Sequence, residues 1–417
     1  MFLLHFLASP NPFIGYGVHA LNLRRELAVL ASSGAFLLQL TDPTKPEELK
    51  QVCELLADMP FDLPVLNVLL GDGRSSHEVL DLLPGQRITY TVFESDVLPE
   101  GWKENLERSD LVLTASDWGA EILRQGLERT PVAVVPEGVD PTLFHQWNRP
   151  TDRQPWQRHE RPEAPLEECF RFLAVGKFET RKSYEELLAA FHLAFADRPD
   201  VRLQLRLHNV FDPTYRERLQ ALDIHGPGDR VLLVEGSEGG VMLSPEGMAD
   251  VYRSSHCFVF PSKGEGWGLP LIEAISCGTP FIATHHSGPL QYLQYCRQSF
   301  SRIEYQLEEI HAPDFLRFHS FRPERPARWA TPSVPSLARQ MRQVYENWWA
   351  VREQAEGNAR RIHQRFSWAA AAETLIDKLY EHLLAPTRAV VSDPLAALAA
   401  PDRDPEAPLD AEVLALM

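Results

Sequence analysis

Short apolar runs alternate with segments of helical periodicity along most of the chain, a pattern typical of parallel α/β sheets. In the first half, apolar residues at helical spacing predict helices over Val18–Ala31 and Asp117–Gly126. The strands predicted in this half are Phe2–Leu7, Ala35–Leu40, Val65–Leu70, Ile88–Phe93, Leu111–Thr114 and Val132–Val135. Residues 145–168 then break the pattern, because they combine prolines and charges without a periodic apolar face. We interpret this segment as a surface linker.

A second alternation of the same kind begins at Phe170. Its predicted strands are Phe170–Val175, Arg202–Leu207, Val231–Val234, Cys257–Phe260 and Pro280–Ala283, and its predicted helices are Tyr184–Phe195, Pro245–Ser254 and Leu269–Cys277. The chain therefore contains two doubly wound halves of similar size. We expect a cleft between them, with ligands beyond the carboxyl ends of the strands.

The remainder of the chain is less regular. Residues 299–335 are rich in Pro, Arg and Phe and predict an irregular insertion, and two long helices are expected over 336–356 and 367–384. The final residues are rich in Ala and Pro, which is typical of a flexible tail. The expected division is a first domain with its linker over 1–165, a second domain over 166–366, a closing helix over 367–384 and the tail over 385–417.

Composition narrows the function classes. The length of 417 residues suggests two or three domains, and an apolar content of 44% is typical of a globular protein. The formal net charge of −17 argues against nucleic acid as a partner, because phosphate recognition needs a basic surface. The five cysteines form no CxxC pair, so neither a zinc site nor a disulfide framework is indicated, and a reducing cytoplasm fits best. The start of the chain lacks a basic n-region and a transmembrane run, which favours a buried strand over a signal peptide.

The richest candidate site follows the predicted strand Cys257–Phe260, where the loop SKGEGWG leads into a helix that opens near Pro270. Proline suits a first helical turn, and the remaining amides together with the helix dipole form an anion site. Glu265 and Glu273 bracket this opening and can flank an extended ligand with a diphosphate between them. The alternative is purely structural: a tight glycine turn and a glutamate stabilised by the helix dipole.

This loop resembles the E-x7-E signature of retaining glycosyltransferases of the GT-B fold, specifically family 4. The matching positions are Glu265, Gly266, Gly268, Leu269, Pro270, Glu273 and Ala274. The segments AVGKFETRKSYEELLAAF, VVPEGVDPTLFHQ and RFSWAAAAETLIDKLYEHL also resemble parts of the family, in the same order. The likeness extends over roughly residues 1–384. It implies two Rossmann-like domains facing a cleft, with the closing helix returning to the first domain.

The resemblance also implies roles for individual residues. Glu273 would bind the nucleotide ribose, and Glu265 would contact hydroxyls of the donor sugar. A basic pair would hold the diphosphate: Lys182 matches the family's lysine, whereas Lys177 replaces an arginine and lacks its bidentate fork. Arg181 lies beside them in the sequence. Read without the family, these cations are better interpreted as a solvated loop.

Two further elements carry open alternatives. Trp267 either lines the acceptor side or is a packed loop aromatic. Gly15 and Gly17 precede a helix, where the family has a loop that closes over the donor phosphate and sugar. Gly15-x-Gly17-x-x-Ala20, with Asp42 further on, also mimics a dinucleotide fingerprint. The fingerprint needs its first glycine at the strand end, however, and here a loop with two prolines intervenes.

Acidic residues at predicted strand ends are candidates for the first domain's contribution. Glu94 and Asp96 follow one strand and Asp72 follows the preceding one, and the acid-x-acid pair is alternatively a metal site. The adjacent His285 and His286 lack metal-ligand spacing and predict an exposed loop. The similar pattern from Asp402 to Asp404 in the tail is interpreted as solvated charge.

Taken together, the sequence predicts a retaining, metal-independent glycosyltransferase that uses a nucleotide-diphosphate sugar as substrate and needs no cofactor. The departing diphosphate would accept the acceptor's proton in a front-face displacement. The acceptor is undefined among glycans, lipid-linked compounds and small molecules, and peripheral membrane contact remains open. The alternatives are a nicotinamide-dependent oxidoreductase and a non-catalytic sugar-nucleotide-binding protein.

Overall fold

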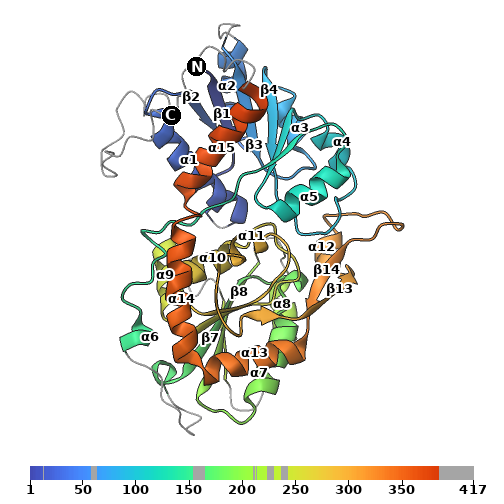
Figure 1. Cartoon of the computed structure of the whole chain (residues 1–417). Coiled ribbons are helices and arrows are strands. Elements are labelled where there is room, and N and C mark those ends of the chain that lie inside the picture. The colour runs from blue at the N-terminus through green and yellow to red at the C-terminus, as the bar shows by residue number, and fades with distance from the viewer. Residues whose placement is uncertain are drawn as a thin grey trace. The chain divides into compact units, whose positions relative to one another are not determined.

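Two compact units make up the chain, each built around one six-stranded sheet (Figure 1). The computed structural model describes residues 1–12, 14–57, 63–153, 165–209, 212, 214–222, 230–235 and 243–384. Unit 1 comprises Met1–Phe93, Leu98–Gly138 and the chain from Trp368 onward, and unit 2 comprises Glu94–Val97 and Val139–Ser367. The prediction of two doubly wound α/β halves is confirmed.

The sheet of unit 1 has the strand order β2-β1-β3-β4-β5-β6, and its pairings are all parallel. The strands are β1 (Leu3–Leu7), β2 (Leu37–Thr41), β3 (Val65–Leu70), β4 (Gln86–Tyr90), β5 (Leu111–Thr114) and β6 (Val132–Val134). The helices are α1 (Gly15–Ala31), α2 (Pro46–Ala57), α3 (Ser76–Leu80), α4 (Trp102–Leu106), α5 (Asp117–Gly126) and α15 (Trp368–Leu379). The inner strands β1, β3 and β5 are mostly apolar, which is typical of a parallel sheet that is covered on both faces.

Unit 2 repeats this plan with the order β12-β11-β10-β7-β8-β9. Its strands are β7 (Phe170–Lys177), β8 (Val201–His208), β9 (Val231–Glu235), β10 (Cys257–Phe260), β11 (Phe281–Thr284) and β12 (Arg302–Ile303). Its helices are α6 (Pro150–Arg153), α7 (Tyr184–Phe195), α8 (Tyr215–Gln220), α9 (Pro245–Arg253), α10 (Leu269–Ser276), α11 (Leu290–Leu293), α12 (Pro313–Leu316), α13 (Val334–Glu346) and α14 (Trp348–His363).

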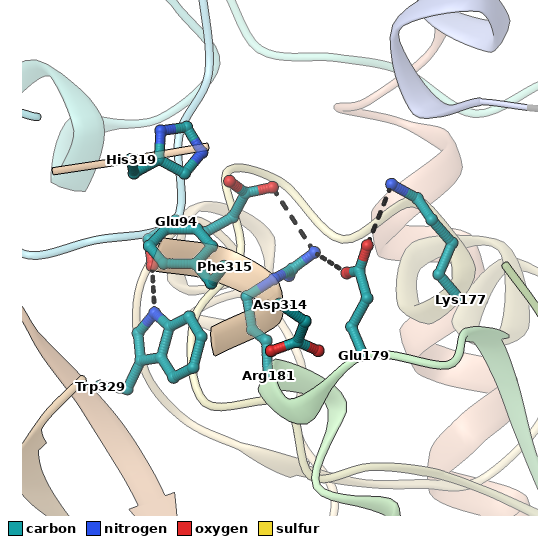
Figure 2. A pocket seen from close by; sticks show the side chains of 8 residues that line it. All are labelled: Glu94, Lys177, Glu179, Arg181, Asp314, Phe315, His319 and Trp329. Atoms are coloured by element: carbon teal, nitrogen blue, oxygen red, sulfur yellow. Dashed lines mark hydrogen bonds and ion pairs between the residues drawn. The ribbon is translucent and has the colours of Figure 1, made fainter. Parts of the chain in front are cut away.

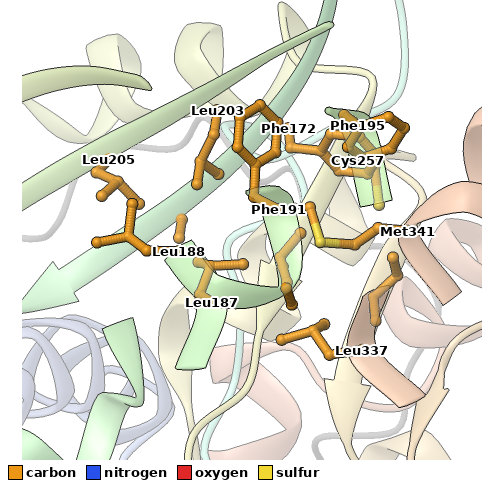
Figure 3. Packing of buried hydrophobic residues seen from close by; sticks show 14 of the residues in the cluster. Phe172, Leu187, Leu188, Phe191, Phe195, Leu203, Leu205, Cys257, Leu337 and Met341 are labelled. Atoms are coloured by element: carbon orange, nitrogen blue, oxygen red, sulfur yellow. The ribbon is translucent and has the colours of Figure 1, made fainter. Parts of the chain in front are cut away.

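The core of unit 2 lies where α7 and α13 cover one face of the sheet (Figure 3). Phe191 and Phe195 of α7 are fully buried against Phe172 of β7, and Met341 of α13 joins the same cluster. The ring centroids of Phe172 and Phe195 are 5.4 Å apart. This packing fixes β7, whose last residue is the candidate site residue Lys177.

Two predicted elements differ from the structure. The single helix expected over 336–356 is divided at Asn347, whose backbone (φ −115°, ψ 24°) leaves the helical region between α13 and α14. The Asn347 amide donates to the carbonyl of Gln343 at 2.9 Å, a side-chain bond that competes with helix continuation. The insertion expected to be irregular forms an antiparallel hairpin of β13 (Tyr305–Glu309) and β14 (Arg328–Pro332), with α12 between the strands.

The boundary between the units also differs from the expected one: the chain passes from unit 1 to unit 2 after Gly138, whereas the expected boundary is at residue 165. Residues that follow are tied into unit 2: buried Arg149 donates to the carbonyl of Ser255 at 2.9 Å, and Arg352 pairs with Asp152 at 2.6 Å. Within unit 1, α15 packs against α1. Residues 154–164 of the expected linker and the expected tail at 385–417, including Asp402 to Asp404, lie outside the described residues.

None of the helices in the described part of the chain combines the length and apolar character that crossing a lipid bilayer requires.

The two glycines at the start of α1 have different surroundings, which gives a matched pair of variants. A Cβ atom at Gly17 would lie 1.7 Å from the backbone oxygen of Asn11, whereas one at Gly15 would meet nothing within 4 Å. Gly17→Ala should therefore destabilise unit 1 by roughly 1–3 kcal/mol through overpacking. Gly15→Ala should change stability by less than about 1 kcal/mol. Urea unfolding followed by circular dichroism measures both, and equal midpoints would mean that the loop at Asn11 moves aside without cost.

Candidate functional site

A buried carboxylate, that of Glu265, lies at the centre of the candidate site in the loop between β10 and α10. Its Oε2 is 2.8 Å from Arg181 Nη1 and its Oε1 is 2.5 Å from Lys182 Nζ. The Ser262 hydroxyl also donates to Oε1. Burial alone would raise the pKa of Glu265, but attraction to Arg181 and Lys182 lowers it to about 2. The carboxylate is therefore charged, and both of its oxygens are paired within the protein, as a buried charge requires.

Sheet topology explains why these groups meet. β7 and β10 are parallel neighbours, so their carboxyl ends lie at the same edge of the sheet. Lys177 ends β7, and the 3₁₀ turn Thr180–Lys182 that follows carries Arg181 and Lys182. The loop after β10 carries Glu265 to the same edge.

The loop before α10 presents backbone donors. Among the described residues, the N–H groups of Gly266, Trp267 and Gly268 donate to no protein acceptor. The loop is held in place because Glu265 N donates to Ser287 Oγ at 2.9 Å and Gly288 N donates to Glu265 O at 2.9 Å. Gly268 adopts φ 91°, which favours glycine, and leads into α10 at Leu269 with Pro270 in its first turn. These amides at a helix N-terminus suit an anionic ligand.

Glu273 extends from α10 and is partly buried. Its Oε2 accepts a hydrogen bond of 3.0 Å from the Tyr252 hydroxyl. Burial raises the pKa of Glu273 to about 7, and the bond from Tyr252 opposes that shift. Glu273 thus differs from Glu265 because no cation neutralises its charge among the described contacts. It has capacity left to accept hydrogen bonds from a ligand.

Glu179 is a member of the site that the sequence interpretation missed (Figure 2). Its Oε1 is 3.4 Å from Lys177 Nζ and its Oε2 is 3.2 Å from Arg181 Nη2. Burial would raise the pKa of Glu179, but Arg181 and Lys177 hold it below its usual value. An acid that alternates with two basic residues directly after a buried strand is a signal that sequence reading can use.

Glu94 and Asp96 do not form the acid pair that the alternative metal site requires. Glu94 Oε1 lies 3.5 Å from Arg181 Nη2, so this residue joins the cluster around Arg181. Asp96 instead accepts from the backbone N and the side-chain Nε of Arg328, at 2.6 and 2.8 Å. Within the described ranges, no three His, Cys, Asp or Glu residues are arranged to hold a metal ion.

Other candidates occupy structural positions. The Trp267 ring is only 3% exposed and packs at 5.1 Å from Tyr292, so its side chain is a packed loop aromatic. The expectation of exposed histidines is wrong, because His285 and His286 are both partly buried, and this burial lowers the pKa of His285 to about 4 and also lowers the pKa of His286. Asp72 accepts from two backbone amides of the following turn, at 2.8 and 3.0 Å.

Gly15 and Gly17 belong to unit 1 and start α1 there. The acid of the alternative dinucleotide fingerprint, Asp42, accepts from the amide and hydroxyl of Thr44 at 3.1 and 2.7 Å. That carboxylate oxygen is therefore occupied in a local turn, and nothing in the structure favours the oxidoreductase alternative.

The chain has two Rossmann-like units, each built on a parallel sheet, and its last described helix belongs to the first unit. This is the architecture of the GT-B class of glycosyltransferases. Residues 157–295 match the family described as "Glycosyl transferases group 1", and the resemblance seen in the motifs is confirmed.

A curated relative is the mannosylfructose-phosphate synthase of Agrobacterium fabrum, 25% identical over 48% of this chain and 43% of its own length. The aligned part of the chain thus spans less than half of that relative. Solved structures with the same fold include a sucrose-phosphate synthase from Thermosynechococcus elongatus (TM-score 0.65, 19% identity, 93% of this chain and 100% of that one). A protein of Anabaena in complex with UDP-glucose also matches (TM-score 0.62, 13% identity, 91% and 100%).

The pKa of Glu273 predicts pH-dependent nucleotide binding. If its carboxylate accepts the ribose hydroxyls, affinity for the tightest-binding of UDP, GDP and ADP should rise as the pH increases from 6 to 8, because the group becomes charged near pH 7. Glu273→Ala should weaken binding at least ~10-fold at pH 8, since charge-assisted hydrogen bonds contribute roughly 1.5–3 kcal/mol each. Isothermal titration calorimetry measures both effects.

Glu273→Gln is the control, because its remaining pH dependence reports the titration of the nucleotide itself. A carboxyl whose pKa is raised on folding stabilises the protein at low pH, and this contribution is lost as the pH rises from about 4.5 through 7. Glu273→Gln should therefore gain stability relative to the wild type at pH 8 but not at pH 4. Identical nucleotide affinities in the wild type and Glu273→Ala would contradict the ribose assignment.

Proposed function

We propose that this protein is a retaining glycosyltransferase that moves a sugar from a nucleotide-diphosphate sugar to an acceptor hydroxyl. The observation that carries the proposal is the position of Glu265, Lys182 and Arg181 beside the amides of residues 266–268, which donate to no acceptor in the described part of the chain. These groups lie within the segment that matches the glycosyl transferase family. The UDP-glucose named for the Anabaena structure supports a nucleotide sugar as the donor class.

In the proposed site, different residues bind the ribose, the diphosphate and the sugar of the donor. Glu273 accepts the ribose hydroxyls, and the loop amides with Lys177 and Lys182 bind the diphosphate. Glu265 contacts the donor sugar and at the same time positions Lys182, because the two are already joined at 2.5 Å. Charge that develops on the departing diphosphate is stabilised by preorganised donors, which is usually the largest catalytic contribution. The diphosphate then accepts the proton of the acceptor hydroxyl.

All five cysteines are free thiols in the structure, which supports the further proposal of a reducing, cytoplasmic location. The acceptor follows from neither the family nor the fold. The name of the Agrobacterium relative includes a sugar phosphate, and we assign the choice of acceptor in this chain to residues outside the donor site.

Lys182→Ala tests the phosphate site. It should lower kcat by roughly 10²–10³-fold, like the loss of one oxyanion donor. Lys177→Ala should have a smaller effect, because Lys177 is half-exposed and lies at the edge of the cluster. Donor consumption with UDP-, GDP- and ADP-sugars measures the rates, and nucleotide release without an acceptor separates a transferase from a non-catalytic binding protein. Wild-type rates in both variants would place the diphosphate elsewhere.

Metal removal tests how the diphosphate charge is neutralised. In the proposed site, fixed cations and a helix N-terminus neutralise the diphosphate. Activity should therefore survive EDTA, with at most modest stimulation by Mg²⁺. Turnover before and after chelation is the measurement. Complete loss with EDTA, restored by Mn²⁺ or Mg²⁺, would overturn the metal-independent mechanism.

A further inference from the structure

The hairpin insertion formed by β13, α12 and β14 is built against the candidate site. Trp329 Nε1 donates to the carbonyl of Glu94 at 2.6 Å, and Ala330 N donates to the carbonyl of Lys263 at 2.9 Å. A small apolar cluster joins the insertion to the segment 94–97. Its buried members are Val97, Ile310, Ala312, Ala327 and Trp329. The insertion is therefore fixed to the site and forms one wall of a pocket (Figure 2).

The lining of this pocket combines hydrogen-bond acceptors and donors. Carboxylates come from three separate segments, with Glu94 after β4, Glu179 after β7 and Asp314 in α12. Lys177 and Arg181 provide the N–H donors. A ring that bears several hydroxyl groups both donates and accepts hydrogen bonds, so it matches such a mixed lining.

One side of the pocket is aromatic. The Phe315 ring lies 4.8 Å from the ring of Trp329 and 4.5 Å from that of His319, and all three residues line the pocket. Pockets that bind small molecules usually pair such apolar surface with a few convergent polar groups. Figure 2 shows the rings grouped on the side of Glu94, away from Lys177.

Asp314 has unused acceptor capacity. Its Oδ2 accepts from Thr180 N at 2.8 Å and from Arg218 Nη2 at 3.4 Å, whereas its Oδ1 is buried and has no hydrogen-bond partner among the described residues. An unpaired buried acceptor is costly, so a ligand that donates a hydroxyl hydrogen there gains more than it would at a satisfied group.

The charges of the pocket disfavour a phosphorylated ligand. The guanidinium of Arg181 is shared among three carboxylates, those of Glu94, Glu179 and Glu265. Lys177 is paired with Glu179 as well. A phosphate group in the pocket would therefore lie near three carboxylates and would be repelled by them, because like charges repel. Lys177 and Arg181, which could attract it, are already paired with carboxylates.

We propose that this pocket is the acceptor subsite and that it binds a neutral, polyhydroxylated ring without phosphate. The assignment rests on the proposed transferase function. Arg181 supports it by position, because one end of the guanidinium contacts Glu265, the proposed donor-sugar residue, and the other end contacts Glu94 and Glu179 of the pocket. The insertion thus supplies specificity, and the family loop supplies the donor site.

Ligand-observed saturation-transfer NMR on the full chain tests the proposal without requiring turnover. The probes are D-glucose, D-mannose and myo-inositol, each compared with D-glucose 6-phosphate. At least one neutral probe should bind, and glucose 6-phosphate should bind at least ~10-fold more weakly. Asp314→Asn and Phe315→Leu should weaken the neutral probe at least ~5-fold. Glu309→Gln is the matched control, because it removes a charge from an exposed position of the same hairpin and should leave binding unchanged.

The subsite proposal would be overturned if glucose 6-phosphate bound preferentially or if none of the neutral probes bound. It would also be overturned if the wild type, Asp314→Asn and Phe315→Leu bound the neutral probe equally well. Nucleotide affinity and donor hydrolysis are measured in parallel for every variant, and the control Glu309→Gln should leave both unchanged. A loss of donor hydrolysis in Asp314→Asn equal to its loss of sugar binding would place the donor sugar in the pocket instead. A wild-type chain that binds the neutral probe but consumes no sugar nucleotide would refute the proposed transferase function alone.

Discussion

The burial of one negative charge, that of Glu265, is the constraint on which the site depends. A carboxylate at 7% exposure requires compensation, and the structure provides it from Arg181 and Lys182. Both cations come from the turn Thr180–Lys182, in which Lys182 precedes Glu265 by 83 residues. The parallel pairing of β7 with β10 brings this turn to the same sheet edge as the loop. Loss of Glu265 would leave the buried Lys182 without this ion pair, and loss of both cations would leave the Glu265 charge unpaired. The loop after β10 and the turn after β7 therefore depend on each other.

Arg181 extends this dependence beyond the donor loop. It donates to the carbonyl of Gly264 at 2.6 Å and contacts three carboxylates. The guanidinium is thus a rigid spacer between the donor loop and the pocket beneath the hairpin. A lysine at this position would carry the same charge, but it lacks the planar set of donors that several fixed acceptors require.

Much of this arrangement could be predicted from the sequence. The strands β3, β5 and β10 and the helices α5 and α7 are where the apolar patterns place them, because each is bounded by clear turn chemistry or by a change of period. Glu265 on the one hand and Arg181 and Lys182 on the other could be selected because each stands in a local motif, but only the family resemblance linked the two motifs. The hairpin could not be predicted, since β13 is mostly exposed and therefore shows no alternation of buried and exposed positions. The pairing of Asp96 with Arg328 depends on a contact between distant segments, which no local pattern records.

The short segment Glu94–Val97 belongs to unit 2 although the chain on both sides of it belongs to unit 1. It is held there by Arg328 and Trp329 of the hairpin. This interleaving constrains how such proteins can be recombined. A chimera that joins the first half of one relative to the second half of another would bring together a segment and a hairpin with separate histories. Exchange of residues 94–97 together with 305–332 would keep the contacts between the segment and the hairpin. The residues that must be exchanged together to preserve this wall of the pocket are therefore encoded by two separate stretches of the gene.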